Sequence, residues 1–230
     1  MSNDQYSQDR LSSVKRRIDS ACRAAGCDPS KVTLIGASKK QSIKSLKSFY
    51  DAGLKDVGEN YLQEAINKQK QLENTPLNWH FIGSIQSNKS KLIAQHFDWV
   101  HGVDRLKIAK RLALYNPKAS AIKLLIQLNP DNEDSKAGVN LGVASELAND
   151  IAQIDNLELH GFMMIPKARQ SETEQRQVFA KAKELLDITN QRYGLTMNHL
   201  SMGMSADLEA AIAEGSTMVR VGTDLFGARS

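Results

Sequence analysis

Short apolar runs alternate with amphipathic stretches along the whole chain. The first run contains Val32-Thr-Leu-Ile35 and the fifth is Ile122-Lys-Leu-Leu-Ile-Gln-Leu128. Runs of this kind are typical of strands that are buried on both faces of a parallel sheet. The pattern predicts eight strands: Val32–Lys39, Asp56–Asn60, Asn78–Ile85, Trp99–Val103, Ile122–Asn129, Leu157–Ile165, Met197–Ser201 and Met218–Thr223.

Helical spacing of apolar positions follows seven of these runs. We expect Ser87 to be the N-cap of a short third helix, and Ser171-Glu-Thr-Glu174 to form the capping box of the sixth. A further helix, Tyr6–Ala25, precedes the first strand and can cover the barrel in place of an eighth. The other predicted helices are Ser42–Ala52, Tyr61–Leu72, Leu106–Tyr115, Val143–Ile154 and Ala206–Ala213.

Alternation of strand and helix predicts an α/β fold with parallel strands and right-handed crossovers. Eight such units favour a closed (β/α)₈ barrel of the TIM type with an additional N-terminal helix. A chain of 230 residues has the usual length for one such barrel, so we expect a single domain over residues 1–230. An open doubly wound sheet is the alternative, because the pattern alone does not exclude it.

Composition narrows the range of partners. The net charge is only +4, and the densest basic stretch, Lys15-Arg16-Arg17, lies in a helical pattern without aromatic neighbours. It reads as a solvated helix face, so no nucleic-acid partner is expected. No apolar run approaches the ~18 residues of a membrane span, and the first residues lack an apolar signal core. The spacing of Cys22 and Cys27 fits neither a redox pair nor a zinc site. We expect a cytoplasmic monomer without metal or membrane contact.

The functional groups of such a barrel lie at the C-terminal ends of its strands. Because side chains alternate, Thr33, Ile35, Ala37 and Lys39 share the inward face, with Lys39 at the rim. Lys40 then faces the helices or the solvent. An amine in a partly desolvated pocket loses proton affinity and can attack an aldehyde. Taken alone, however, Lys39 is better explained as a solvated lysine at a strand end.

The loops after strands seven and eight are the usual phosphate site of this fold. In the segment Ser201-Met-Gly-Met-Ser205, we expect Gly203 to let the backbone approach a ligand. Free N–H groups near Ser205 can bind an anion at the following helix start. Gly222-Thr223 adds an N–H group and a hydroxyl. Helix capping by Ser205 is an equally good explanation, and two nearby acidic residues, Asp207 and Glu209, would repel a phosphate unless they point away.

Arg220 is expected to point into the barrel, because Val219 and Val221 on either side suit the helix layer. A buried guanidinium needs partners. The partner of Arg220 can be a ligand or an interior carboxylate. A carboxylate partner would make a structural ion pair, with Glu59 or Asp104.

Five short motifs at the ends of different strands together resemble the YggS/PROSC pyridoxal phosphate homeostasis family. They cover nearly the whole chain in the same order: Gly36-Ala-Ser-Lys39, Gly58-Glu-Asn-Tyr61, His80-Phe-Ile-Gly83 with Gln86-Ser-Asn-Lys89, Ser201-Met-Gly-Met-Ser205, and Val219-Arg-Val-Gly-Thr223. That family is similar in turn to the barrel domain of alanine racemase. The resemblance implies pyridoxal 5′-phosphate (PLP) as the cofactor, bound as a Schiff base on Lys39.

The resemblance also assigns the other cofactor-binding residues. Arg220 would face the pyridine nitrogen, Asn60 and His80 would line the ring pocket, and Ser201 belongs to the same set. The phosphate would be held by Met204, Ser205, Gly222 and Thr223.

The implied function is a carrier or regulator of intracellular PLP that affects amino-acid balance, with apo PLP-dependent enzymes as recipients. No efficient catalysis is expected. A PLP-dependent amino-acid racemase is the alternative. It needs an acid–base group on each face of the substrate, and Tyr61 or His80 would have to supply the second. A third hypothesis is a barrel enzyme that binds a phosphate ligand without PLP.

Overall fold

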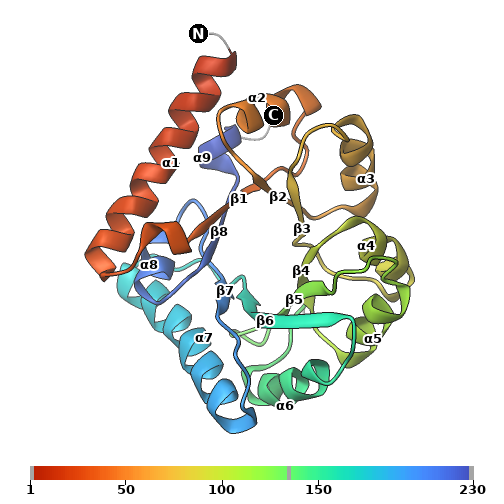
Figure 1. Ribbon diagram of the computed structural model, residues 1–230. Helices are drawn as coiled ribbons and strands as arrows, with labels where there is room; N and C mark the ends of the chain where they lie inside the picture. Colours follow the sequence, from red (N-terminus) through yellow and green to blue (C-terminus); the bar gives the residue numbers. More distant parts are fainter. Residues whose placement is uncertain (1–2, 134–135, 228–230) are drawn as a thin grey trace.

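The computed structural model describes residues 3–133 and 136–227, and within them eight parallel strands close into a barrel in chain order (Figure 1). The closed barrel confirms the predicted fold class and excludes the open sheet. Positions 1–2, 134–135 and 228–230 of the predicted domain lie outside the described residues. The strands are β1 (Thr33–Ala37), β2 (Asp56–Glu59), β3 (Asn78–Phe81), β4 (Trp99–Val103), β5 (Ile122–Leu128), β6 (Leu157–Met164), β7 (His199–Ser201) and β8 (Met218–Val221).

Helices surround the barrel, and the first one completes their ring (Figure 1). The N-terminal helix packs against the helices that follow β1, β7 and β8, so it covers the barrel as expected. The helices are α1 (Asn3–Ala25), α2 (Ile43–Asp51), α3 (Leu62–Gln71), α4 (Ser90–His96), α5 (Leu106–Tyr115), α6 (Leu141–Ala152), α7 (Glu172–Tyr193), α8 (Leu208–Ala213) and α9 (Thr223–Phe226). Two short 3₁₀ turns lie at Pro29–Lys31 and Ser87–Lys89.

Side-chain caps fix the starts of α2, α6 and α7. The capping box of α7 is present, with the Ser171 side chain accepting from the Glu174 amide and the Glu174 side chain accepting from the Ser171 amide. The prediction for Ser87 was wrong. Ser87 is the first residue of a 3₁₀ turn that runs into α4, and neither segment has a side-chain cap.

Several strands are shorter than predicted, most clearly β3, which ends at Phe81 rather than Ile85. Gly83 explains the early end. A Cβ atom on Gly83 would lie 2.3 Å from the carbonyl oxygen of Asn60. Only glycine allows the two loops to approach this closely, and the chain leaves the barrel there instead of extending the strand.

Alternation along the strands separates the barrel interior from the helix layer. Ile35, Leu125, Met163 and Met218 form a buried cluster inside the barrel. Gly36, the outward neighbour of Ile35, faces Leu54 and Phe226 in the layer between strands and helices. Every second residue of a strand therefore faces the barrel interior, as the pattern predicted for the face that carries Lys39 and for Arg220.

Candidate functional site

Lys39 stands at the C-terminal rim of the barrel, two residues after β1 ends. Its side chain is half-buried, and its Nζ lies 4.6 Å from the centroid of the Tyr61 ring. This lysine lowers the pKa of the Tyr61 hydroxyl by a hydrogen bond and by its charge. Lys40 is exposed and has a left-handed backbone with φ 62°. Lys39 is therefore the lysine of this pair that faces the site.

A cavity of about 520 Å³ opens beside Lys39. Asn60 and Tyr61 line it from the loop after β2, and Gly83 and Gln86 line it from the loop after β3. The close contact of Gly83 with the Asn60 backbone fixes the two loops against each other. The structure thus brings Lys39 and Asn60 together, as the sequence predicted.

A buried cluster that the sequence did not indicate holds the backbone on both sides of Lys39. The Lys68 ammonium donates to the Ser38 carbonyl at 2.7 Å, and to the carboxylates of Glu59 at 2.6 Å and Glu64 at 2.7 Å. The same Glu64 carboxylate accepts from the Lys40 amide at 2.6 Å. The peptide groups before and after Lys39 are therefore both fixed by one ion cluster.

Glu59 is fully buried inside this cluster. Its Oε1 also accepts from the Ser38 hydroxyl at 2.5 Å, whereas its Oε2 has no hydrogen-bond partner among the described residues. Burial raises the pKa of Glu59, and the contacts with Lys68 and Ser38 oppose that rise. The orphaned oxygen makes this carboxyl group costly to keep charged.

The second of the predicted phosphate loops lies beside β1. Gly222 follows the last residue of β8, and its Cβ position is 3.5 Å from the carbonyl oxygen of Ala37, the residue two before Lys39. Within the described part of the chain, the amides of Ser205, Gly222 and Thr223 have no hydrogen-bond partner. These amides are available to an anion. The Met204 amide is not, because it donates to the Asp207 side chain at 2.7 Å.

Gly203 also has a packing role. Its φ is 91°, and a Cβ atom there would lie 2.6 Å from the Cβ of Ala211, so the glycine lets α8 pack closely against the loop. Its expected close approach to a ligand stays a prediction. The alternative of helix capping by Ser205 does not hold for α8, whose N-cap is Asp207. The Ser205 hydroxyl instead accepts a long hydrogen bond from the Asp224 amide, at 3.4 Å.

The two acidic residues near the phosphate loop both have partners. Asp207 accepts from the Met204 amide, and burial raises its pKa. The Glu209 carboxylate binds Arg17 of α1, at 2.7 and 2.8 Å. Arg17 also binds Asp224 and donates to the Ser205 carbonyl at 2.9 Å. The basic stretch of α1 is therefore more than a solvated face, because Arg17 joins both phosphate loops.

Arg220 points into the barrel as predicted and is 3% exposed. It donates to the Ser201 hydroxyl at 2.6 Å and to the Met164 carbonyl at 2.9 Å. Burial lowers the pKa of Arg220 to about 10, and Asp207 opposes this. The suggested ion pair with Glu59 or Asp104 was wrong, since Glu59 binds Lys68 and Asp104 binds Arg105.

His80 and Ser201 lie deeper than the other predicted site residues. They are 1% and 0% exposed, and neither lines the cavity beside Lys39. His80 contacts Asp56 and His101, and Ser201 contacts His101 and Arg220. Both residues thus lie in the barrel interior, in the network that includes Arg220. Their expected contact with the cofactor remains a prediction.

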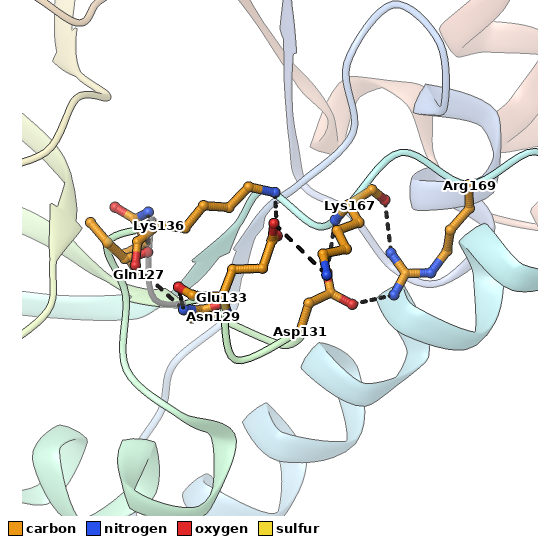
Figure 2. A network of polar contacts seen from close by, with 8 residues as sticks. Gln127, Asn129, Asp131, Glu133, Lys136, Lys167 and Arg169 are labelled. Carbon is orange, nitrogen blue, oxygen red and sulfur yellow. Dashed lines mark hydrogen bonds and ion pairs between the residues drawn. The ribbon is translucent and has the colours of Figure 1, made fainter.

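Another polar network ties together the segments that follow β5 and β6 (Figure 2). Asn129 holds the backbone of Glu133, and the Glu133 carboxylate binds the Lys136 ammonium at 2.7 Å. Asp131 accepts from the Lys167 amide and pairs with Arg169. Lys136 is therefore held in an ion pair, unlike Lys39.

Sequence reasoning missed Lys68, Glu64 and Arg17. The i,i+4 spacing of Glu64 and Lys68 was a visible signal for a helix pair. It gave no sign that the pair reaches across to Ser38. The contacts of Arg17 join positions that are about 190 and 207 residues apart, which a local pattern cannot reveal.

Comparison with known proteins shows the family of this chain. The family described as alanine racemase, N-terminal domain, matches residues 16–230. A pyridoxal phosphate homeostasis protein of Pseudomonas aeruginosa is 48% identical over 96% of this chain and 95% of its own. One from Escherichia coli K12 is 42% identical over 95% of each chain.

Solved structures of related proteins have the same barrel fold. PipY of Synechococcus elongatus with PLP bound has a TM-score of 0.86 and 33% identity, over 96% of this chain and 100% of its own. Alanine racemase from Corynebacterium glutamicum shares the fold alone, with a TM-score of 0.64 and 16% identity over 95% of this chain and 61% of its own. In the described residues, no helix has the length and apolar character to cross a membrane. The chain belongs to the alanine racemase N-terminal domain family and, within it, to the pyridoxal phosphate homeostasis proteins.

Proposed function

We propose that this chain binds PLP through Lys39 and takes part in PLP homeostasis, as a carrier or regulator rather than an efficient enzyme. The observation that carries the proposal is the position of Lys39. This half-buried amine stands at the end of β1, and the unpartnered amides of Gly222 and Thr223 lie at the end of the adjacent β8. An aldehyde-reactive group and an anion site are thus neighbours on one barrel rim.

The residues present fit an aldehyde that carries a phosphate. PLP, when bound, supplies an aldehyde carbon and a ring that withdraws electrons from attached amines. Lys39 would hold that carbon through its side-chain amine. The amides of Ser205, Gly222 and Thr223, with the Thr223 hydroxyl, would hold the phosphate. Asn60, in the same cavity as Lys39, would contact the ring.

Arg220 argues for binding rather than turnover. A guanidinium can only donate hydrogen bonds. Facing the pyridine nitrogen, Arg220 would keep that nitrogen unprotonated and would weaken electron withdrawal by the ring. The relatives from Pseudomonas aeruginosa and Escherichia coli are likewise named homeostasis proteins rather than enzymes. Apo PLP-dependent enzymes would be the recipients of the bound PLP.

The racemase alternative lacks a suitable second base at the positions considered. The Tyr61 ring centroid lies 4.6 Å from the Lys39 Nζ, so Tyr61 is a direct neighbour of the first base. His80 is 1% exposed and already bound to Asp56 and His101. A racemase needs acid–base groups on opposite faces of the substrate, and this pair of candidates does not provide them.

The test compares two adjacent lysines. We expect purified protein with added PLP to show Schiff-base absorbance near the visible range that borohydride bleaches. Lys39→Ala should abolish this absorbance without unfolding the barrel, because Lys39 is a rim residue. The matched control is Lys40→Ala, which removes an exposed amine one residue away and should leave the absorbance unchanged.

Three results would contradict the proposal. Full absorbance in Lys39→Ala would place PLP on another lysine, with Lys40 and Lys136 as the candidates. No bleachable absorbance in the unaltered protein would favour a phosphate-ligand barrel without PLP. Racemisation of amino acids at ordinary enzyme rates, on the order of 1–10³ per second, would replace the carrier role with the racemase alternative.

A further inference from the structure

A continuous chain of hydrogen bonds crosses the barrel interior below the proposed PLP site. It begins with Arg220, which donates to the Ser201 hydroxyl at 2.6 Å. Ser201 contacts His101 Nδ1 at 2.9 Å, and His101 Nε2 contacts His80 Nδ1 at 3.0 Å. His80 Nε2 reaches the Asp56 carboxylate at 3.1 Å. The five residues come from β8, β7, β4, β3 and β2, so the chain links strands from across the barrel.

The direction of this chain follows from its two ends. Asp56 as a carboxylate can only accept, so His80 Nε2 must carry a proton. If both imidazoles are neutral, His80 Nδ1 is bare and accepts from a protonated His101 Nε2. His101 Nδ1 is then bare and accepts the Ser201 hydroxyl proton. This leaves Ser201 Oγ to accept from Arg220, whose guanidinium can only donate. Every bond therefore points the same way.

Burial supports the neutral state of His101. This ring is 0% exposed, and burial holds its pKa well below the ordinary value. A proton on His80 would reverse the adjoining bonds. His101 would then have to donate from Nδ1 to Ser201, and the Ser201 hydroxyl proton would lose its acceptor in the chain of hydrogen bonds.

We propose that Arg220, Ser201, His101, His80 and Asp56 form one directed chain, and that His101 and His80 are positioning residues that hold Arg220 as a donor at the cofactor site. The direction of the chain is independent of any ligand. Its effect on PLP rests on the function proposed above. Arg220 uses two bonds, to Ser201 and Met164, to fix its plane. Among the described residues, the other three of its five N–H groups have no hydrogen-bond partner.

Asp56 places a negative charge at the end of the hydrogen-bonded chain that lies opposite Arg220. It is the first residue of β2, at the end of the barrel opposite the rim that carries Lys39, and its side chain is 22% exposed. Asn78 donates to the same carboxylate at 3.0 Å. The buried cation of Arg220 and the partly solvated anion of Asp56 thus polarise the two rings in one sense. Aligned bonds of this kind strengthen one another in a low-dielectric interior.

The first experiment reads the proton positions directly. Solution NMR of the full chain, labelled with ¹⁵N in its histidine rings, distinguishes a protonated ring nitrogen from a bare one. At neutral pH and without PLP we expect His80 and His101 both to be protonated at Nε2 and bare at Nδ1. The spectra of His80→Gln and His101→Gln assign the two rings. A His101 ring protonated at Nδ1, or a doubly protonated ring at either position, would overturn the proposed direction.

The second experiment tests whether the chain positions Arg220. In His101→Gln, the amide oxygen can accept from Ser201 and the amide nitrogen can donate to His80, so the order of donors and acceptors is kept. In His101→Phe both bonds are lost. We expect PLP affinity in the glutamine variant to stay within about twofold of wild type and the phenylalanine variant to lose about fivefold, a change typical of one net hydrogen bond.

The outcomes separate the possible explanations. Equal losses in the two variants would mean that His101 acts by packing alone, and no loss in either would mean that the chain does not position Arg220. Thermal unfolding shows whether each variant folds. If His101→Phe does not fold, the NMR result on the unaltered protein still decides the direction of the hydrogen bonds. Failure of the proposed function would appear differently, as an absence of PLP binding with the ring protons placed as expected.

Discussion

At the scale of single residues, the two cations of the proposed site are held in different ways. Lys39 is half-buried at the rim with its amine over the Tyr61 ring. Arg220 is almost completely buried and has both a hydroxyl and a carbonyl partner. An amine that must react needs an accessible nitrogen, whereas a guanidinium that only orients a ring needs a fixed plane. The contrast matches a covalent role for Lys39 and a binding role for Arg220.

The phosphate residues make a prediction at this scale. Ser205→Ala and Thr223→Ala should each weaken PLP binding by about 1–3 kcal/mol, because a hydrogen bond to a charged group is lost. Pyridoxal lacks the phosphate, and its binding should be insensitive to both changes. Titration of each variant with the two ligands, followed by absorbance, measures the difference. Equal losses for PLP and pyridoxal would move the phosphate site elsewhere.

At the scale of elements, α1 does more than complete the helix ring. Through Arg17 it joins Glu209 of α8, Asp224 of α9 and the Ser205 carbonyl. The hydrogen bond to Glu209 raises the pKa of Arg17 despite partial burial. The helix that precedes β1 therefore holds the two loops where the phosphate is proposed to bind, and sets their separation.

This arrangement predicts an effect of α1 on ligand binding. Arg17→Gln should weaken PLP binding, because the loops that carry Ser205 and Thr223 lose their common partner. The cost in unfolding free energy should be only about 1 kcal/mol, since Arg17 and its partners are partly solvated. Arg16→Gln is the matched control, an exposed arginine one position away on the same helix. Isothermal titration with PLP and urea unfolding report the two quantities. Equal effects of the two substitutions on PLP affinity would contradict the role of Arg17.

At the scale of the whole molecule, the sequence was sufficient for the barrel and for much of its rim. Alternation along β1 and β8 placed Lys39 and Arg220 correctly, because the period of a strand is local information. The strand ends were harder to predict. The early end of β3 depends on a contact between Gly83 and Asn60, two residues on different loops. The contacts of Lys68 and Arg17 were also out of reach, because tertiary partners decide them.

One fully buried histidine, His101, and one half-buried histidine, His199, predict a pH dependence of stability. Burial lowers the pKa of His199 from 6.5 to about 4, and holds the pKa of His101 well below 6.5. In both cases the unfolded chain binds the proton more readily than the folded one. The stability they contribute is present above about pH 6.5 and is lost as pH falls through the folded-state pKa.

Urea unfolding at a series of pH values tests this prediction. The unfolding free energy should fall as pH decreases from 6.5 toward 4, and the fall should be shallower in His199→Gln than in the unaltered protein. Acidic residues contribute equally to both curves, so the difference between them isolates His199. Parallel curves would show that His199 is not kept neutral by the fold.

Peptide mapping tests directly whether Lys39 is the lysine that binds PLP. The full chain is incubated with PLP and reduced with borohydride, which converts a Schiff base to a stable amine. The chain is then cleaved, and each lysine that carries the added pyridoxyl phosphate is identified by mass spectrometry. We expect the label on Lys39, and we expect Lys40 and Lys136 to remain unmodified at equimolar PLP. A label found mainly on another lysine, or spread over the surface lysines, would contradict it.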